Sequence, residues 1–198
     1  MKTKMKKMPL KLLGIIKSSS KTDIVFDFDQ TIAKILIDWD EWEVLMGELM
    51  KKFDPGWVSL GDGIHHRLNE YIKKYGSDFC QEVVKITSEF ELKNNKGFIL
   101  NTELVDLVRQ VDKRMYLFTS NTRELVIPYL KKEGLFDLFG KIIARNDVLY
   151  AKPDPEGLGL IYNSRIQKRN YVFIGDSKND RAAALAFGID HFYTPKFW

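Results

Sequence analysis

The stretch Asp23–Thr31, with the sequence DIVFDFDQT, places the strongest constraint on how this chain folds. Its apolar residues form a short run typical of a buried strand in a parallel sheet. Because strand side chains alternate between faces, Asp27 and Asp29 point the same way if the strand stays regular. Two carboxylates at the end of a buried strand repel each other and lose hydration. A divalent cation, which prefers oxygen ligands, would relieve that cost. An acidic turn after an ordinary strand is the alternative.

After residue 98 the chain alternates between helical and strand-like segments. The apolar patterns predict strands at 114–118, 140–144, 171–174 and 189–193, and helices at 102–111, 122–133, 154–165 and 177–187. Strands that alternate with helices of this length indicate parallel βαβ units. The sequence therefore predicts the α/β class, with a Rossmann-like parallel sheet between layers of helices.

A helical segment interrupts this alternation after the first strand. Helices are expected at 38–53, 64–75 and 78–92, with glycine-containing breaks at 54–56, 61–63 and 76. A turn or short ribbon at 32–37 and a polar connector at 93–97 flank them. We therefore predict an all-α insertion at 34–96 within a core made of 21–33 and 97–198.

Positive charge is concentrated at the N-terminus. Seven of the 31 Lys and Arg residues precede Asp23, and the rest of the chain, with 24 basic and 27 acidic residues, is mildly acidic. A nucleic-acid-binding fold carries its basic face on the fold itself, so specific nucleic-acid binding is not favoured. We expect residues 1–20 to form a basic, flexible or weakly helical arm. Contact of this arm with an anionic surface is the alternative.

Two features bear on the cellular compartment. The single cysteine, Cys80, excludes an internal disulfide and fits a reducing environment. The apolar part of the arm, Pro9–Ile16, is short, contains Lys11 and lacks a following cleavage site of small residues. No stretch reaches the roughly 18 apolar residues of a spanning helix. We expect a cytoplasmic protein without a transmembrane segment, either a monomer or a homodimer.

Polar side chains follow four of the predicted strands, at the edge where ligands bind in parallel α/β sheets. They are Asp27 and Asp29, then Thr119, Ser120 and Asn121, then Lys152, and finally Asp176 and Asp180. Each group alone has an ordinary explanation as a helix cap, a solvated lysine or a turn. Their occurrence in this order at successive strand ends indicates a single site.

The stretches DFDQT, FTSN, AKPDP and GDSKND together resemble the four-motif signature of the haloacid dehalogenase (HAD) superfamily. The resemblance covers about Lys21–Tyr193. It is strongest to the branch with a helical, C1-type cap between the first two motifs, which includes phosphoglycolate phosphatases and β-phosphoglucomutase-like proteins. It implies a HAD core with an inserted all-α cap, and a Mg²⁺-dependent phosphatase acting on a small phosphorylated metabolite.

The resemblance also implies roles for individual residues. Asp27 resembles the nucleophile that forms an aspartyl-phosphate, and Asp29 the general acid and base. Mg²⁺ would be held by the Asp27 carboxylate, the Asp29 backbone carbonyl and Asp176, with Asp180 binding or orienting beside it. The Thr119 hydroxyl, the Ser120 N–H and Asn121 would hold phosphate oxygens, and Lys152 would offset the charge of nucleophile and phosphate.

The sequence departs from the common pattern at Gln30, where many relatives have glycine. In the cap, the candidate specificity residues are Trp57, His65 and Arg67, with Trp39 and His66 as further candidates. For each of these, burial in the cap core or a solvated helix position is the competing explanation. The three histidines do not have the spacing of a zinc site.

Three other functions stay open at this point. A sugar-phosphate mutase would use the same intermediate and the same motifs. A non-catalytic binding module would keep the fold without turnover, although the intact Asp27, Asp29, Lys152 and Asp176 argue against it. Nucleic-acid binding through the lysine-rich arm would show a steep salt dependence.

Overall fold

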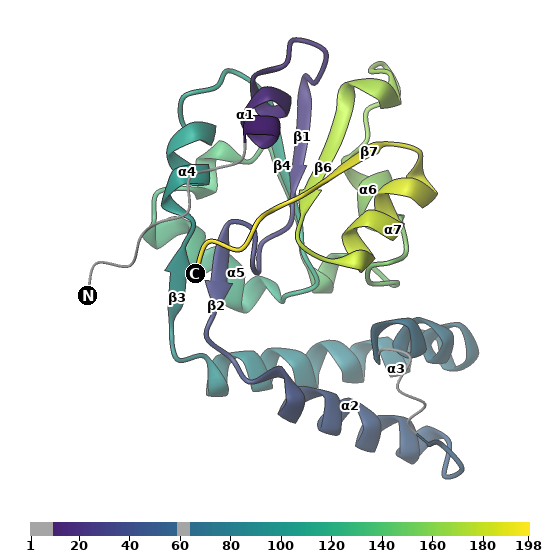
Figure 1. Cartoon of the computed structure of the whole chain (residues 1–198). Coiled ribbons are helices and arrows are strands. Elements are labelled where there is room, and N and C mark those ends of the chain that lie inside the picture. The colour runs from purple at the N-terminus through teal and green to yellow at the C-terminus, as the bar shows by residue number, and fades with distance from the viewer. Residues whose placement is uncertain (1–9, 59–63) are drawn as a thin grey trace.

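A computed structural model of the chain, which describes residues 10–58 and 64–198, contains a five-stranded parallel sheet (Figure 1). The strands are β1 (Asp23–Phe26), β4 (Arg114–Phe118), β5 (Lys141–Ile143), β6 (Tyr171–Gly175) and β7 (Asp190–Tyr193), in the order β5-β4-β1-β6-β7. Phe26 is in register with Leu117 of β4 and with Ile174 of β6, so the three central strands end together. The predicted α/β class and parallel sheet are confirmed.

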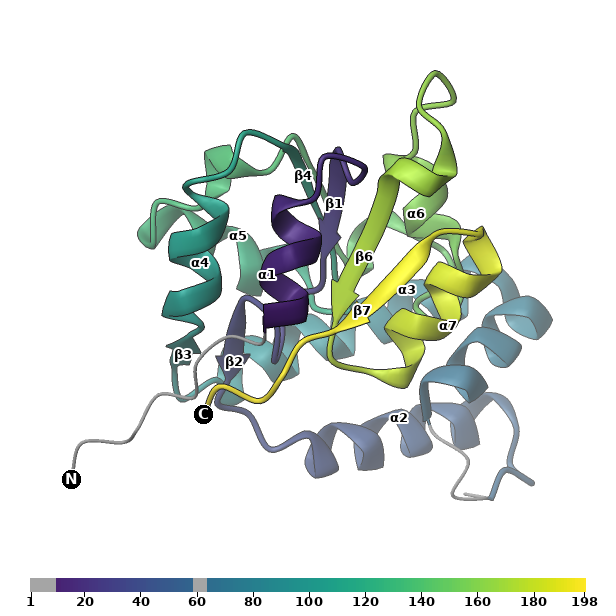
Figure 2. The same cartoon turned by 45° about the horizontal axis from the view of Figure 1, so that its top comes forward.

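Helices cover both faces of the sheet because strand side chains alternate. One face is covered by α1 (Leu10–Lys17), α4 (Thr102–Val108) and α5 (Arg123–Lys132), the other by α6 (Glu156–Ile161) and α7 (Lys178–Phe187) (Figure 2). In β1, Ile24 and Phe26 belong to the apolar cluster of the first face, and Val25 to that of the second. Both faces of β1 are therefore buried, and its end is a rigid platform.

Two long helices form an insertion that leaves and re-enters the core through a short ribbon. The strands β2 (Ala33–Ile35) and β3 (Phe98–Leu100) pair antiparallel at its base. Between them lie α2 (Trp39–Phe53) and α3 (Ile64–Asn94), which share an apolar cluster of their own. We call α2 and α3 the helical insertion. It lies below the carboxyl ends of the sheet strands (Figure 1).

The insertion follows the predicted pattern with one refinement. The helices expected at 64–75 and 78–92 are continuous in α3, but Gly76 interrupts them with a φ of 77°. Glycine adopts this left-handed conformation without the penalty of a side chain, so Gly76 bends the helix instead of ending it. The break expected at 61–63 lies outside the described residues.

The N-terminal segment differs from the free arm that the charge pattern predicted. Residues 10–17 form α1, and the side chains of Leu12 and Ile16 are buried against the sheet. An apolar pair four residues apart lies on one side of a helix, which lets lysines occupy the other side. Of the flexible and weakly helical alternatives, residues 10–17 follow the helical one, and they pack on the core instead of extending from it as an arm. Residues 1–9 lie outside the described part of the chain.

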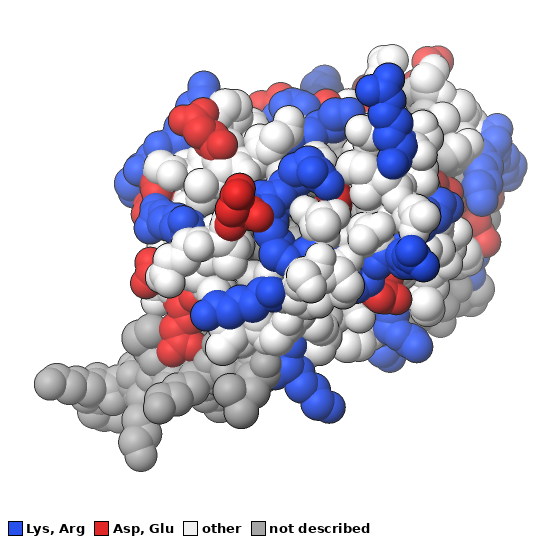
Figure 3. Space-filling view, turned by 90° about the horizontal axis from the view of Figure 1, so that it is seen from above, with Lys and Arg blue, Asp and Glu red and all other residues white. Residues whose placement is uncertain are grey.

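Several basic residues near this end bind other parts of the core. Lys21 Nζ lies 2.5 Å from Asp190 Oδ2, and Lys113 Nζ donates to the carbonyls of Ser18 and Lys21. Arg114 binds both carboxylate oxygens of buried Asp23, at 2.7 and 2.6 Å. Figure 3 shows basic and acidic side chains intermixed on this pole, which is opposite the helical insertion.

Helices elsewhere are shorter than predicted: α4 ends at Val108, and α6 covers only Glu156–Ile161. Among the described residues, no helix has both the length and the apolar character needed to cross a bilayer.

Candidate active site

The carboxyl ends of the strands and the helical insertion together enclose a cavity of about 210 Å³. Asp27 follows β1, Ser120 follows β4 and Asp176 follows β6, while Lys152 comes from the loop between β5 and α6. The lining residues on the core side are Asp27, Asp29, Gln30, Ser120, Asn121, Lys152, Asp176, Ser177 and Asn179. The residues on the insertion side are Trp39, Trp42, Glu43, His65, Thr87 and Glu91. The sheet topology thus gathers the predicted polar groups in one place.

Lys152 joins two carboxylates at the floor of the cavity. Its Nζ lies 2.6 Å from Asp27 Oδ1 and 2.5 Å from Asp180 Oδ1, and it also donates to the carbonyl of Phe118. All three charged side chains are at least nine-tenths buried. Burial alone would lower the pKa of Lys152, but the charges of Asp180 and Asp27 raise it above its usual value. Lys152 is therefore a permanently charged, fixed cation.

The ion pair with Lys152 does not fully offset the cost of burying the Asp27 carboxylate beside two other acids. Burial and the nearby carboxylates of Asp180 and Asp176 raise its pKa well above the usual range, against the opposing effect of Lys152. Carboxylate oxygens of Asp27, Asp176 and Asp180 lie within 4.8 Å of one another. An all-carboxylate donor set of this kind fits a hard divalent cation, which would supply the missing positive charge.

Asp180 is the most constrained of the three acids. Its Oδ2 accepts hydrogen bonds from the N–H of Ser177 at 2.9 Å and from the Ser177 hydroxyl at 2.6 Å, which forms the capping box of α7. Gly175 permits this arrangement because a Cβ there would lie 2.5 Å from Asp180 Oδ2. Since Lys152 occupies the other oxygen, Asp180 is better placed to orient its neighbours than to bind a metal alone.

Asp29 sits in a tight turn at the cavity mouth. Its Oδ1 accepts a hydrogen bond from the N–H of Ile35 at 2.8 Å, and the side chain of Trp39 also donates to it. Burial, together with the charge of Asp176, raises the pKa of Asp29 to about 6 against these hydrogen bonds. The next residue, Gln30, has a φ of 60°, in the left-handed region that glycine adopts most readily. A glycine at this position would adopt the same turn without a side-chain penalty.

The loop after β4 is held by a carboxylate from the helical insertion. The Thr119 hydroxyl donates to Asn121 Oδ1 at 2.9 Å and accepts from the Asn121 N–H at 3.1 Å. Asn121 Nδ2 donates to Glu91 Oε1 at 2.8 Å, and the N–H and hydroxyl of Thr122 bond to Glu91 Oε2. Asn121 is therefore fixed at both ends of its amide, and Ser120 is the loop residue that faces the cavity without such a lock.

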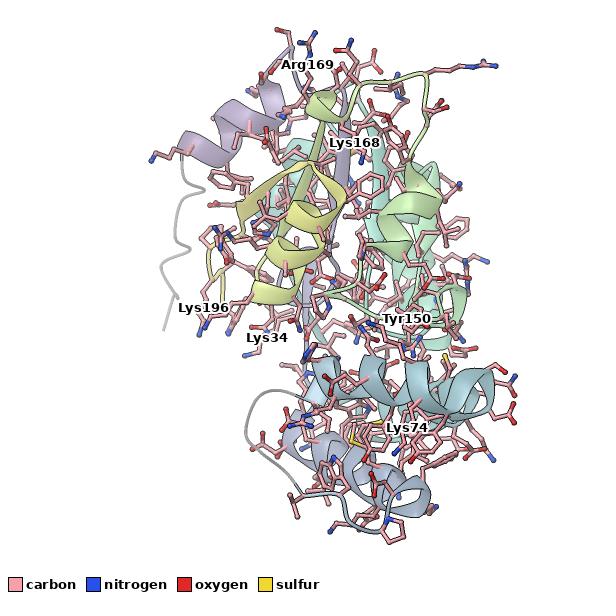
Figure 4. All side chains as sticks on the ribbon, turned by 90° about the vertical axis from the view of Figure 1, so that its right-hand side faces the viewer. Lys34, Lys74, Tyr150, Lys168, Arg169 and Lys196 are labelled. Atoms are coloured by element: carbon pink, nitrogen blue, oxygen red, sulfur yellow. The ribbon has the colours of Figure 1, made fainter. Side chains whose placement is uncertain are left out.

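A second contact joins the insertion to the lysine loop. Asn69 of α3 is buried and exchanges two hydrogen bonds with the backbone of Ala151, at 2.7 and 3.0 Å. Ala151 immediately precedes Lys152. Tyr150 lies at the boundary between the core and the helical insertion (Figure 4) and packs against the insertion's apolar cluster. Thus α3 binds both core loops that carry the predicted phosphate ligands.

The insertion-side candidates divide into two groups. His65 lines the cavity, and its ring lies 5.2 Å from that of Trp42, whose indole N–H donates to Thr87. Trp57 and Arg67 do not line it. The Trp57 ring packs against α2, where it would contact a Cβ on residue 47 at 3.0 Å, and Arg67 Nη1 lies 3.8 Å from Glu70.

Sequence reasoning missed Glu91 and Asn69. One signal could have identified Glu91. Cys80, Val83, Thr87 and Glu91 are spaced so that they share one helix face, and that face is buried. A carboxylate in line with a buried helical face requires a partner, because an unpaired buried charge is costly.

A family model described as haloacid dehalogenase-like hydrolase matches residues 24–193. The chain belongs to this family. It is 33% identical over 155 residues to a phosphoglycolate phosphatase of Thiobacillus denitrificans, which covers 77% of this chain and 60% of that protein. It is also 24% identical over 169 residues to the pyrophosphatase PpaX of Listeria welshimeri, and this match covers 80% of this chain and 76% of that protein. Matches to phosphoglycolate phosphatases span as little as 32% of the relative's length.

The fold is shared with CbbY of Rhodobacter sphaeroides, solved in complex with phosphate. That comparison has a TM-score of 0.56 at 17% identity and covers 89% of this chain and 87% of the other. At this level of identity the likeness concerns the fold alone.

Proposed function

We propose that this chain is a Mg²⁺-dependent phosphatase that hydrolyses a small phosphate monoester through an aspartyl-phosphate. The observation that carries the proposal is the buried group of Asp27, Lys152 and Asp180, which opens beside Asp29 and Asp176 into a cavity. Family membership and the phosphatase names of the relatives support it. The small cavity volume favours a small ester, since sites for larger ligands usually exceed about 300 Å³.

The first half of the reaction transfers the phosphoryl group to the enzyme. A carboxylate oxygen of Asp27 attacks phosphorus, and the bond between phosphorus and the ester oxygen breaks. Asp29, whose pKa is raised to about 6, gives its proton to the leaving oxygen. Lys152 holds Asp27 in place through Oδ1, and the backbone N–H of Ser120 would bind a phosphoryl oxygen.

The second half releases phosphate. Asp29, now ionised, takes a proton from water, the water oxygen attacks phosphorus, and the bond to Asp27 breaks. Asp27, Asp176 and the Asp29 carbonyl would hold Mg²⁺, and Asp180 would orient this group through Lys152 and Ser177. The ion, when bound, neutralises the charge that builds up on the phosphoryl oxygens. The helical insertion acts as a cap that limits water and substrate access.

The test is hydrolysis of p-nitrophenyl phosphate with Mg²⁺ or with EDTA, for wild type and for Asp27→Asn. We expect EDTA to abolish turnover and Asp27→Asn to lose more than about a hundredfold, because a nucleophile contributes several powers of ten. Asp137→Asn, which changes an exposed aspartate, is the matched control and should retain full activity. Circular dichroism of each variant checks the fold.

Two outcomes would contradict the proposal. Metal-independent turnover would remove the role of the carboxylate cluster, and an active Asp27→Asn variant would remove the nucleophile. If wild type shows no turnover, trapping with beryllium fluoride and Mg²⁺ separates an intact aspartyl site from an inactive fold.

A further inference from the structure

The insertion side of the cavity, which we call the insertion wall, would face the alcohol part of a phosphate ester. It differs in charge from the core side, where the phosphate group would bind. Among the described residues, Lys152 is the sole lysine or arginine that lines the cavity, and Asp27, Asp180 and the Phe118 carbonyl occupy its ammonium group. The insertion side presents two tryptophans, a histidine, a threonine and two glutamates. A second anionic group on a substrate would therefore find no basic side chain on that wall.

The histidine does not supply the missing positive charge. Burial, with the nearby charges of Lys152 and Arg145, lowers the pKa of His65 to about 4, so its ring is neutral at physiological pH. Thr87 is already the acceptor for the Trp42 indole N–H. What remains on this wall is aromatic surface and carboxylate.

Two lysines near the cavity are directed toward Trp198, and the charge of one of them, Lys196, also reaches Asp176 on the core side. Lys34 and Lys196 lie at the junction of core and insertion (Figure 4), but their ammonium groups are over the ring of Trp198, at 4.7 and 5.8 Å from its centre. Neither lines the cavity. In contrast, Glu43 both lines the cavity and is exposed, so its charge stays hydrated and available.

We infer that the insertion wall selects phosphate esters by the charge of the leaving alcohol: an ammonium-bearing alcohol is preferred, an uncharged one is accepted, and a carboxylate or second phosphate is disfavoured. The exposed Glu43 carboxylate attracts a cation and repels an anion, and the aromatic rings of this wall carry no charge that would oppose it. This inference rests on the proposed function. It predicts a substrate class that differs from those in the names of the phosphoglycolate phosphatase and pyrophosphatase relatives.

The test uses three esters with nearly the same skeleton. Ethanolamine phosphate carries an ammonium group, 2-hydroxyethyl phosphate a hydroxyl and 2-phosphoglycolate a carboxylate, and in each the charged or polar atoms are attached to the second carbon from the phosphate oxygen. We expect kcat/KM to fall in that order, with at least about a tenfold difference between the first and the last, because one unit charge near Glu43 changes sign. Equal rates, or faster hydrolysis of 2-phosphoglycolate, would overturn the inference.

Glu43→Lys provides the sharper test because it reverses the charge of the wall without touching the core. We expect the ratio of kcat/KM for ethanolamine phosphate to that for 2-phosphoglycolate to fall at least about tenfold. Glu41→Lys is the matched control: Glu41 is an exposed residue of α2 that does not line the cavity, so its change should leave the ratio as in wild type. An unchanged ratio in Glu43→Lys overturns the inference.

The same experiment separates the two proposals. Hydrolysis of 2-phosphoglycolate in preference to the other esters leaves the phosphatase proposal intact and overturns the selection by charge. Failure to hydrolyse any of the three esters or p-nitrophenyl phosphate, together with no trapping by beryllium fluoride, overturns the proposed function and the selection with it.

Discussion

The core wall and the insertion wall of the cavity are stabilised by different interactions. On the core wall, Asp27, Lys152 and Asp180 are fixed by charged hydrogen bonds of 2.5 to 2.6 Å. On the insertion wall, Trp42 lies between two other rings, with centroids 5.2 Å from His65 and 6.2 Å from Trp39. Charged hydrogen bonds are directional and fix atoms, whereas ring packing depends mainly on shape and area.

This difference fits a division of labour in which the core performs the chemistry and the insertion selects the substrate. A change on the core wall should affect every substrate, and a change on the insertion wall should affect substrates unequally. Glu91 and Asn69 are exceptions, because they belong to the insertion but bind the core loops. Substitutions on each wall therefore test whether chemistry and selection are separated in this way.

The largest effect is expected for Lys152→Met. Removing the ammonium group leaves the buried carboxylates of Asp27 and Asp180 unpaired, which should cost about 3–5 kcal/mol of unfolding free energy. Turnover of all esters should fall by at least about a hundredfold, since a fixed charge at the reacting group is lost. Urea unfolding and p-nitrophenyl phosphate kinetics measure the two effects.

Lys178→Met is the control for that substitution, because Lys178 is exposed at the start of α7. Surface changes of this kind usually alter stability by less than about 0.5 kcal/mol. If Lys152→Met unfolds within that range of wild type, the core wall is not held together by charge, and the comparison fails.

An intermediate effect is expected for Glu91→Gln. As a carboxylate, Glu91 only accepts hydrogen bonds, and Asn121 and Thr122 both donate to it. The glutamine amide would instead place an N–H group against at least one of these donors. The cost should be about 1–3 kcal/mol at about pH 8, where Glu91 is largely ionised, and turnover of every ester should fall together because Asn121 is no longer fixed. Glu82→Gln, at an exposed position of the same helix, should change neither quantity. A loss of turnover that differs between substrates would instead show that Glu91 acts with the insertion wall in substrate selection.

Glu91 also gives a pH prediction. Burial, with a contribution from the charge of Asp29, raises its pKa from 4.5 to about 7 against the hydrogen bonds from Thr122 and Asn121. A carboxyl whose pKa is higher in the folded state contributes stability below its unfolded pKa and loses it as pH rises through the folded value. The stability advantage of wild type over Glu91→Gln should therefore shrink between about pH 4.5 and about pH 7, by at most about 1.4 kcal/mol per pH unit. A constant or growing difference would show that Glu91 is ionised throughout.

The core wall could be predicted from the sequence far better than the insertion wall. Asp27, Ser120 and Asp176 each follow a strand of a parallel sheet, so local pattern and one topological rule place them together. No comparable rule tells which side of an insertion helix faces the core. His65 was a candidate and lines the cavity, while Trp57 and Arg67 were candidates and do not.

The same reasoning explains the errors elsewhere. The burial of Leu12 and Ile16 was obscured by the lysines around them, because charge composition describes a segment and not its two helical faces. Glu91 was overlooked because a glutamate near a helix end is usually solvated, and its donors come from residues thirty or more positions later. Contacts between distant segments depend on how the insertion docks, which periodicity does not report.

The smallest predicted effect is a gain, from Gln30→Gly. Gln30 has a φ of 60°, and a left-handed conformation costs a side-chain-bearing residue about 1–2 kcal/mol. Glycine removes that strain but adds about 0.5–1 kcal/mol of chain entropy to the unfolded state, so we expect a net stabilisation of about 0.5–1 kcal/mol. Gln30→Ala shortens the side chain and keeps the strain, so it should give no gain.

The backbone N–H of residue 30 donates to the carbonyl of Ala33 whatever the side chain, so the turn that places Asp29 is kept in the glycine variant. If both variants lose activity on larger esters only, the Gln30 side chain takes part in substrate selection, as the insertion wall does, although it comes from the core.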